Sequence, residues 1–295
     1  MHTATYYIDL LLSGITVGSL YALIAIGYTM VYGILRLINF AHGDIFMMAG
    51  FFMVYISASM PMAVAIPVVL IMTVALGLLI ERAAYKPLRS APRMSVMISA
   101  IGVSYLLQNL ATYITGGLAR PYPEIPFLKG TFMLGALKIK VITVVTPLLT
   151  VLLVIALVLF INHTKTGMAM RAVSRDFDTA RLMGIKVNNI ISVTFIIGSF
   201  LAGVGSILYF SNYGQVSPTI GAMPGLKAFV AAVFGGIGSI PGAVLGAYII
   251  GICESLIKAN DAIAILSNAF TFALLILVLL FKPNGMFGEK LAEKV

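Results

Sequence analysis

The amino-acid sequence predicts an all-α, polytopic membrane protein of about eight transmembrane helices, with a broken or re-entrant helical hairpin at residues 226–258. The 295-residue chain is 60% hydrophobic and only 10% charged, whereas a soluble domain carries about 25% charged residues. Several apolar runs reach the length of about 20 residues that a helix needs to cross a hydrocarbon core of about 30 Å. A glycine- and proline-rich break interrupts one of these runs.

The first apolar run carries no charged residue from residue 10 to residue 35. A signal peptide has a basic segment followed by an apolar region of about 7–15 residues. This run is longer and follows no basic segment, so we expect a retained transmembrane helix. The second span is expected at 40–58 and the third at 62–80, with a short turn between them. Further spans are expected at 94–115, 141–162, 190–210 and 262–281.

The apolar run at 226–258 is broken by the sequence GGIGSIPG at 235–242. If the basic segment at 163–189 and the C-terminal tail lie on the same side of the membrane, an even number of crossings separates them. The spans at 190–210 and 262–281 already give two, so residues 226–258 should form a hairpin. It is either a re-entrant pair of half-helices or two short spans. Irregular backbone at membrane depth requires surrounding protein or a water-filled cavity, whereas glycines also permit close helix packing. Both roles stay open for the tip residues Gly235, Gly236, Gly238, Pro241 and Gly242.

Lysine and arginine residues gather in segments 81–93 and 163–189 and in the tail after residue 281. An excess of these residues marks cytoplasmic segments. Three spans precede the first segment, so we expect the N-terminus outside and the C-terminus in the cytoplasm. The segment 116–140 also carries four basic residues, although the number of crossings places it outside. We expect one membrane domain, 1–295, without a soluble domain.

His42 and Asp44 lie two residues apart in the stretch LINFAHGDIF. A helix that began at residue 45 would rise only about 24 Å before the next turn, so the helix must begin near residue 40 and include both residues in its first turns. Asp44 is then either a first-turn carboxylate favoured by the helix dipole and paired with His42 or Arg36, or a polar lining of a transport path. Ionisable residues inside a membrane are candidates for function.

Other polar residues fall in or beside the predicted spans. Asn39 precedes the histidine, and Gln108 and Asn109 lie within the fourth span. Amides in such positions more often form hydrogen bonds between helices, and both uses stay open. Glu254 and Lys258, four residues apart, predict an ion pair near the membrane surface.

The segment 163–189 predicts a short helix over 177–183, with Ser174 or Asp176 as its N-cap and Gly184 in the left-handed position that ends it. This helix is partly apolar, and the chain has no soluble core to cover it. It therefore either docks on a partner protein or lies on anionic lipid.

Other classes of chemistry find little support. The single cysteine, Cys253, forms no internal disulfide. The three histidines have no metal-ligand spacing, and no cofactor or metal is expected. A net charge of +9 is compatible with nucleic-acid binding, but the basic residues stand in short segments between apolar runs, as in a membrane protein.

Four stretches of the chain resemble the permeases for branched-chain amino acids in ATP-binding-cassette importers, of the LivH type. They are INFAHGDIFMMAGF at 38–51, ERAAYKPLR at 81–89, TGMAMRAVSRDFDTARLMGIKVNNI at 166–190 and FVAAVFGGIGSIPGAVLGAYIIGICESL at 229–256. The resemblance covers nearly the whole chain. Permeases of related urea importers share the histidine–glycine core of the first stretch.

The resemblance implies a permease subunit in a bacterial inner membrane that moves leucine, isoleucine and valine. It implies a second permease subunit (a paralogue or a copy of this chain), two ATPase subunits and a periplasmic substrate-binding protein. The segment 163–189 would be the coupling loop that docks on the ATPase, with candidate residues Arg171, Ala172, Asp176, Asp178, Ala180, Arg181 and Gly184.

The chain lacks a Walker A sequence, so ATP hydrolysis would take place on the partners and the chain itself would not be an enzyme. Two alternatives stay open at this point. One is an ion-coupled secondary transporter, since broken helices near the midplane are typical of that class. The other is a permease or channel for urea or another small neutral solute.

Overall fold

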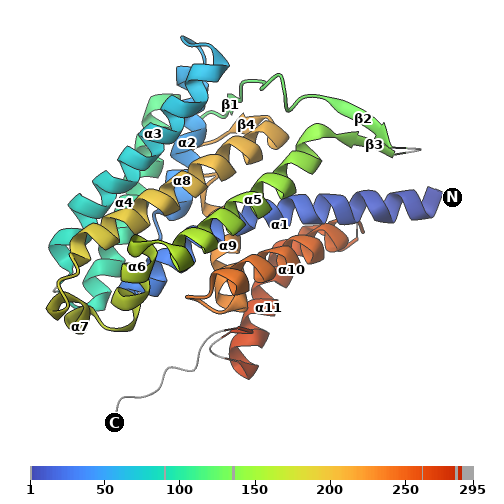
Figure 1. The fold of residues 1–295 in the computed structure, drawn as a ribbon. Coiled ribbons are helices and arrows are strands. Elements are labelled where there is room, and N and C mark those ends of the chain that lie inside the picture. Colours follow the sequence, from blue (N-terminus) through green and yellow to red (C-terminus); the bar gives the residue numbers. More distant parts are fainter. Residues whose placement is uncertain (1, 90, 135–136, 261, 283–284, 288–295) are drawn as a thin grey trace.

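The computed structural model describes residues 2–89, 91–134, 137–260, 262–282 and 285–287. Most of these residues are helical, and four short strands complete the fold (Figure 1). The helices are α1 His2–Leu35, α2 His42–Ile56, α3 Met62–Ile80, α4 Arg93–Thr115, α5 Val141–His163, α6 Lys165–Arg175, α7 Phe177–Leu182, α8 Val187–Tyr213, α9 Ala222–Gly235, α10 Ile240–Lys258 and α11 Ser267–Phe281. The predicted all-α, polytopic membrane class is confirmed.

Seven of the described helices are long and apolar enough to cross a membrane: α1, α3, α4, α5, α8, α10 and α11 with the short η3 Ala264–Leu266 before it. Two apolar helices are shorter. With 15 residues in α2 and 14 in α9, each rises only about 21–23 Å. The second span is therefore shorter than predicted by two residues at each end, and the predicted hairpin is present as α9 and α10.

Several features were not predicted from the sequence. The third span continues beyond Ile80 as one π-helical turn, η1 Glu81–Tyr85, and a 3₁₀ turn, η2 Lys86–Leu88. Two small antiparallel ribbons are also present. In one, β2 Thr131–Leu134 pairs with β3 Leu137–Lys140, and in the other, β1 Arg120–Pro121 pairs with β4 Gln215–Val216.

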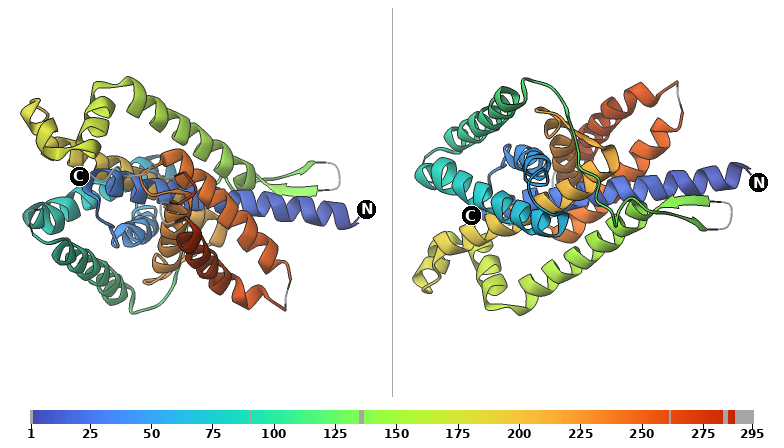
Figure 2. Two further views of the ribbon diagram at one scale, coloured as in Figure 1. Left: turned by 90° about the horizontal axis from the view of Figure 1, so that it is seen from below. Right: turned by 90° about the horizontal axis from the view of Figure 1, so that it is seen from above.

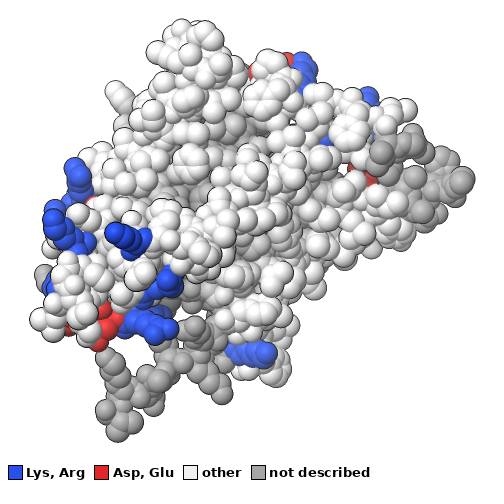
Figure 3. Space-filling model, viewed as in Figure 1, with Lys and Arg blue, Asp and Glu red and all other residues white. Residues whose placement is uncertain are grey.

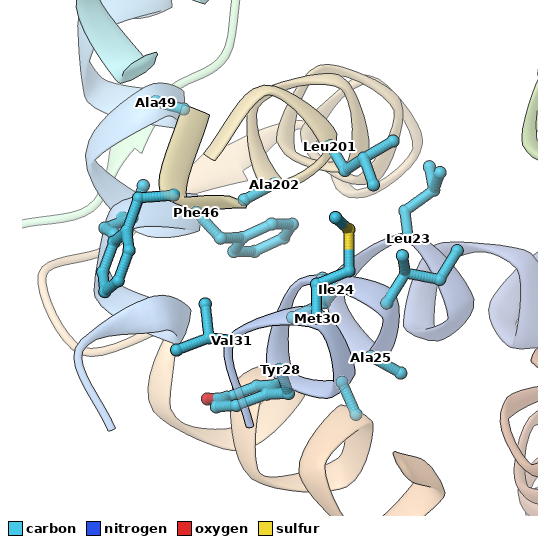
Figure 4. Packing of buried hydrophobic residues seen from close by; sticks show 14 of the residues in the cluster. Leu23, Ile24, Ala25, Tyr28, Met30, Val31, Phe46, Ala49, Leu201 and Ala202 are labelled. Carbon is cyan, nitrogen blue, oxygen red and sulfur yellow. The ribbon is translucent and has the colours of Figure 1, made fainter. Parts of the chain in front are cut away.

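Helix α1 runs through the centre of the molecule, with α5 along one flank and α10 and α11 along another (Figure 2). Its residues Leu20 to Ile26 are almost completely buried. Glycines permit the closest contacts, because a Cβ atom at Gly18 would lie 2.8 Å from the Tyr248 Cα of α10. The core continues from α1 to Phe46 of α2 and to Leu201 of α8 (Figure 4). This packing by small residues is typical of membrane helices.

The molecule has two ends. The turn after α1 meets the end of α6, just before α7, at one end of the molecule. There the Arg36 guanidinium donates to the Ser174 carbonyl at 3.3 Å, and Gly33 packs against Gly238 of the α9–α10 turn. We call this end the α7 end. The N-terminus and the β2–β3 ribbon lie at the opposite, N-terminal end (Figure 1). Lysine and arginine side chains gather at the α7 end, and much of the remaining visible surface is uncharged (Figure 3).

Candidate functional site

Asp44 lies in the first turn of α2, as predicted, and bonds to α4. Its carboxylate accepts hydrogen bonds from the Ser104 hydroxyl at 2.5 Å and from the Gln108 amide at 3.0 Å. Ser104 is eleven residues from each end of α4, or about 16 Å of helix. The carboxylate, in a residue only 2% exposed, therefore lies near the middle of a spanning helix rather than at the membrane surface.

The structure gives Asp44 neither of its two expected partners. Arg36 lies at the α7 end, and the His42 ring faces α1. The carboxylate also does not cap its own helix, since the N-cap of α2 is Ala41 and receives no side-chain hydrogen bond. Ser104 was not anticipated from the sequence, although its spacing of four residues from Gln108 places both on one face of α4.

His42 is buried in a pocket formed by small residues. Its ring meets Tyr28 edge-to-face at 4.9 Å between centroids, and a Cβ atom at Gly27 would lie 2.1 Å from its Nε2 atom. Gly198 of α8 faces the same ring. Only a glycine at position 27 leaves room for this side chain, so the histidine is packed between α1 and α8.

Two further candidate amides have separate environments. The Asn39 side-chain oxygen accepts a hydrogen bond from the Tyr85 hydroxyl at 2.8 Å, which attaches the turn before α2 to the π-helical end of the third span. Asn109 is exposed on α4, and its amide donates to the Tyr105 carbonyl of the same helix at 2.7 Å. The structure therefore joins Asp44 with Gln108, and places Asn39 and Asn109 elsewhere.

The two short helices begin side by side. A Cβ atom at Gly43 of α2 would lie 2.6 Å from the Gly221 carbonyl oxygen and 3.1 Å from the Gly225 Cα at the start of α9. From this crossing α9 continues to the turn at the α7 end. The first turns of α2 and α9 thus meet beside Asp44, within the bundle.

In the segment between α5 and α8, the short helix α7 forms as predicted, whereas helix α6 was not predicted from the sequence. Asp176 is the N-cap of α7, accepting hydrogen bonds from the backbone amides of Asp178 at 3.0 Å and Thr179 at 3.1 Å. The helix ends at Leu182, one residue earlier than expected, and Gly184 has a φ of 81°. Ala180 is buried, whereas Leu182 and Met183 are 87% and 78% exposed.

Helix α6 holds this segment against the bundle. The Arg171 guanidinium donates to the Ile161 carbonyl near the end of α5. Ala172 is half-buried, and Arg181 is exposed on α7. The candidate coupling residues therefore divide into residues that attach the segment to the bundle and residues that face outward.

The turn between α9 and α10 is closely packed. A Cβ atom at Gly235 would lie 1.9 Å from the Gly242 carbonyl oxygen. Gly236 and Gly238 have φ angles of 107° and 102°, which only glycine adopts without strain. Pro241 lies in the first turn of α10, after the N-cap Ser239. The amides of Met286 and Phe287 donate to the carbonyls of Phe234 and Gly235 at 2.9 Å and 3.0 Å, so the end of α9 is packed against protein, whereas Gly238 at the tip of the turn is exposed.

A buried charged cluster joins α1, α9 and α10. The Glu254 carboxylate accepts hydrogen bonds from Lys227 at 2.6 Å, from Lys258 at 2.5 Å and from the Tyr21 hydroxyl at 2.9 Å. The predicted pair of Glu254 and Lys258 is confirmed, but sequence reasoning missed Lys227, whose side chain is 6% exposed. A lone lysine within the apolar run of α9 was the available signal.

A second ion pair lies at the α7 end. Glu81, 1% exposed, pairs with Arg89 and accepts a hydrogen bond from Ser192 of α8 at 3.1 Å. Arg89 also donates to the Asn188 side chain at 2.5 Å. In the part of the chain that the structure describes, no group of three or more histidine, cysteine, aspartate or glutamate side chains is placed to hold a metal ion.

Comparison with known proteins agrees with this architecture. The family model described as branched-chain amino acid transport system, permease component, matches residues 10–279. The high-affinity branched-chain amino acid transport system permease protein BraD of Pseudomonas aeruginosa is 42% identical, over 98% of each chain. The corresponding protein LivH of Escherichia coli strain K12 is 40% identical, again over 98% of each chain.

A more distant relative is the probable branched-chain amino acid transport permease protein LivH of Methanocaldococcus jannaschii. It is 28% identical, over 92% of this chain and 89% of its own length. The matches extend over all the spans described above. This chain therefore belongs to the family of branched-chain amino acid transport permeases, as a multi-pass transport subunit and not an enzyme.

Proposed function

We propose that this chain is the membrane-spanning subunit of a bacterial importer that moves leucine, isoleucine and valine into the cytoplasm, driven by ATPase subunits bound at α7. The substrate class is supported by relatives with 40–42% identity over 98% of the chain. The observation that carries the coupling to an ATPase is the exposed apolar end of α7.

Helix α7 has the features of a docking element. Its six residues are too few to form a stable isolated helix, and Ala180 attaches it to the bundle while Leu182 and Met183 remain exposed. Large apolar side chains that project together from a small polar element indicate a protein contact. An ATPase subunit would cover them, with Arg181 at the edge of the interface.

The contacts of α6 provide a route for motion. Arg171 ties α6 to the end of α5, and Arg36 ties the Ser174 carbonyl to the end of α1. A displacement of α7 by the ATPase would therefore move two spanning helices. This coupling supports alternating access in which the α7 end and the N-terminal end open in turn.

The orientation follows from the charge distribution. Because basic residues favour the cytoplasmic side, the α7 end would face the cytoplasm and the N-terminal end the periplasm. A periplasmic binding protein would then deliver substrate at the end that carries the two ribbons. A second permease subunit, either a paralogue or another copy of this chain, would complete the pathway in the inner membrane.

Co-purification of the subunits tests the coupling assignment. We expect Arg181→Glu to leave membrane insertion intact and to reduce the amount of ATPase that co-purifies with the tagged permease. Lys138→Glu, a charge reversal on β3 at the N-terminal end, is the matched control and should leave co-purification unchanged. Equal ATPase recovery with both variants would contradict docking through Arg181, and uptake of leucine by the chain alone would favour a secondary transporter.

A further inference from the structure

An apolar pocket lies between α2 and α4. Its volume is about 150 Å³, and an apolar protein cavity of about this size holds a guest as large as benzene. The isobutyl or isopropyl group of a branched amino acid is smaller than benzene. The pocket is lined chiefly by Met48, Phe51, Phe52 and Tyr55 of α2 and by Ala111 and Ile114 of α4.

The Asp44 network lies directly beside this pocket. Asp44 precedes Met48 by four residues on α2, and Gln108 precedes Ala111 by three residues on α4. Both separations amount to about one helical turn, roughly 4.5–6 Å. These are separations of backbone positions along the two helices, and they are comparable to the distance from the ammonium group of leucine to its methyl groups.

Asp44 lacks a compensating positive charge. Its hydrogen-bond donors Ser104 and Gln108 are neutral, and no lysine, arginine or histidine in the described ranges forms an ion pair with it. The two other buried acidic side chains that the structure describes are both compensated, because Glu254 pairs with two lysines and Glu81 pairs with Arg89. An uncompensated carboxylate at membrane depth is costly, and an incoming ammonium group would compensate it.

The carboxylate also has free capacity for such a contact. An ionised carboxylate offers about four acceptor positions, and the two bonds from α4 occupy two of them. Those bonds hold the group in a fixed orientation about one helical turn before the residues that line the pocket. The region between α2 and α4 therefore combines an oriented carboxylate with a neighbouring apolar recess, which matches an amino acid with an aliphatic side chain.

We propose that the groove between α2 and α4 is a transient binding site for the transported amino acid, with the substrate ammonium group on Asp44 and its branched side chain among Met48, Phe52 and Ala111. This proposal rests on the proposed function and names the site within the pathway. Because a binding protein delivers the substrate, the site needs to hold it only weakly.

The first test is leucine uptake by the complete importer in proteoliposomes. Loss of a charge-assisted hydrogen bond weakens an interaction by about 1.5–3 kcal/mol, so Asp44→Asn should lower initial uptake at least about tenfold. Asp9→Asn makes the same chemical change at an exposed position near the N-terminus and should leave uptake unchanged. Uptake by Asp44→Asn within about twofold of the unsubstituted importer would overturn the proposal.

The second test measures occupancy without relying on transport. Cys253 is the only cysteine of this chain, so a Cys253→Ser background accepts single reporter cysteines whose labelling is read on this subunit. Ile114 lines the pocket, whereas Tyr113, the next residue, is 87% exposed and lies outside it. In the complete importer, saturating leucine with binding protein and ATP should slow thiol labelling of Ile114→Cys but not of Tyr113→Cys.

The outcomes separate the two levels of inference. If the unsubstituted importer takes up no leucine, the proposed function fails. If it takes up leucine while labelling of Ile114→Cys is unaffected by substrate, the proposed function stands and the site in the groove is wrong. Slower labelling at both positions would indicate a general conformational change and would also overturn the proposal.

Discussion

The buried cluster around Glu254 offers the sharpest test of how the hairpin is held in the bundle. In Glu254→Gln, the amide keeps nearly the shape of the carboxylate but removes the only acidic partner that the described residues give to Lys227. The Lys227 side chain is 6% exposed, and its ammonium group is 2.6 Å from the carboxylate. The substitution therefore leaves a buried positive charge without compensation between α9 and α1.

The size of the effect follows from which partner remains buried. Removing one member of a buried ion pair costs about 3–5 kcal/mol, and we expect the lower part of this range because the amide oxygen still accepts hydrogen bonds. Lys258→Ala removes the other lysine, whose side chain is 52% exposed, and exposed pairs contribute about 0–1 kcal/mol. The double substitution Lys227→Met with Glu254→Gln removes both charges and should recover most of the lost stability.

Thermal unfolding of the purified permease in detergent measures these differences. The variants must be compared at one heating rate, because irreversible unfolding reports a rate. We expect the midpoints to rank Glu254→Gln well below Lys258→Ala, with the double substitution close to Lys258→Ala. A Glu254→Gln midpoint equal to that of Lys258→Ala would refute the reasoning, because Lys227 would then need no buried counter-charge.

Three further predictions concern local contacts. Gly43→Ala should reduce the yield of monodisperse protein on size-exclusion chromatography, because its Cβ would lie 2.6 Å from the Gly221 carbonyl oxygen. Gly102→Ala, whose Cβ would meet no packed neighbour within 4 Å, should leave the yield unchanged. Equal yields would contradict the close crossing. Asp176→Ala should destabilise α7 by about 1 kcal/mol through loss of its N-cap, detected as faster proteolysis within 177–183, and unchanged proteolysis would refute the cap. Tyr85→Phe leaves the buried Asn39 oxygen without its donor and should cost about 1–3 kcal/mol in the same thermal assay; an unchanged midpoint would show that this bond contributes nothing.

Local features of the fold were accessible from the sequence. Run length and charge predicted the spanning helices, and length arithmetic placed Asp44 in the first turn of α2. The cap by Asp176, the left-handed Gly184 and the pair of Glu254 with Lys258 depend on residues close together in the chain. Helix capping and i,i+4 pairing act over a few residues, so sequence spacing is sufficient to predict them.

Long-range contacts were not accessible in the same way. Ser104 and Gln108 meet Asp44 across 60 and 64 residues, and Lys227 meets Glu254 across 27 residues. Close crossings at glycines, such as Gly43 with Gly221, decide which helix faces meet. A glycine in the sequence does not indicate which helix packs against it. The pocket beside Asp44 therefore emerges only when α2 and α4 are placed together.

Leucine accumulation in proteoliposomes tests the central claim most directly. The permease is reconstituted with its second permease subunit and its ATPase subunits, the binding protein is supplied at the N-terminal end, and ATP at the α7 end. We predict accumulation that requires both ATP and the binding protein and that stops when either is omitted. Accumulation by this chain alone, driven by an ion gradient without ATP, would contradict the account.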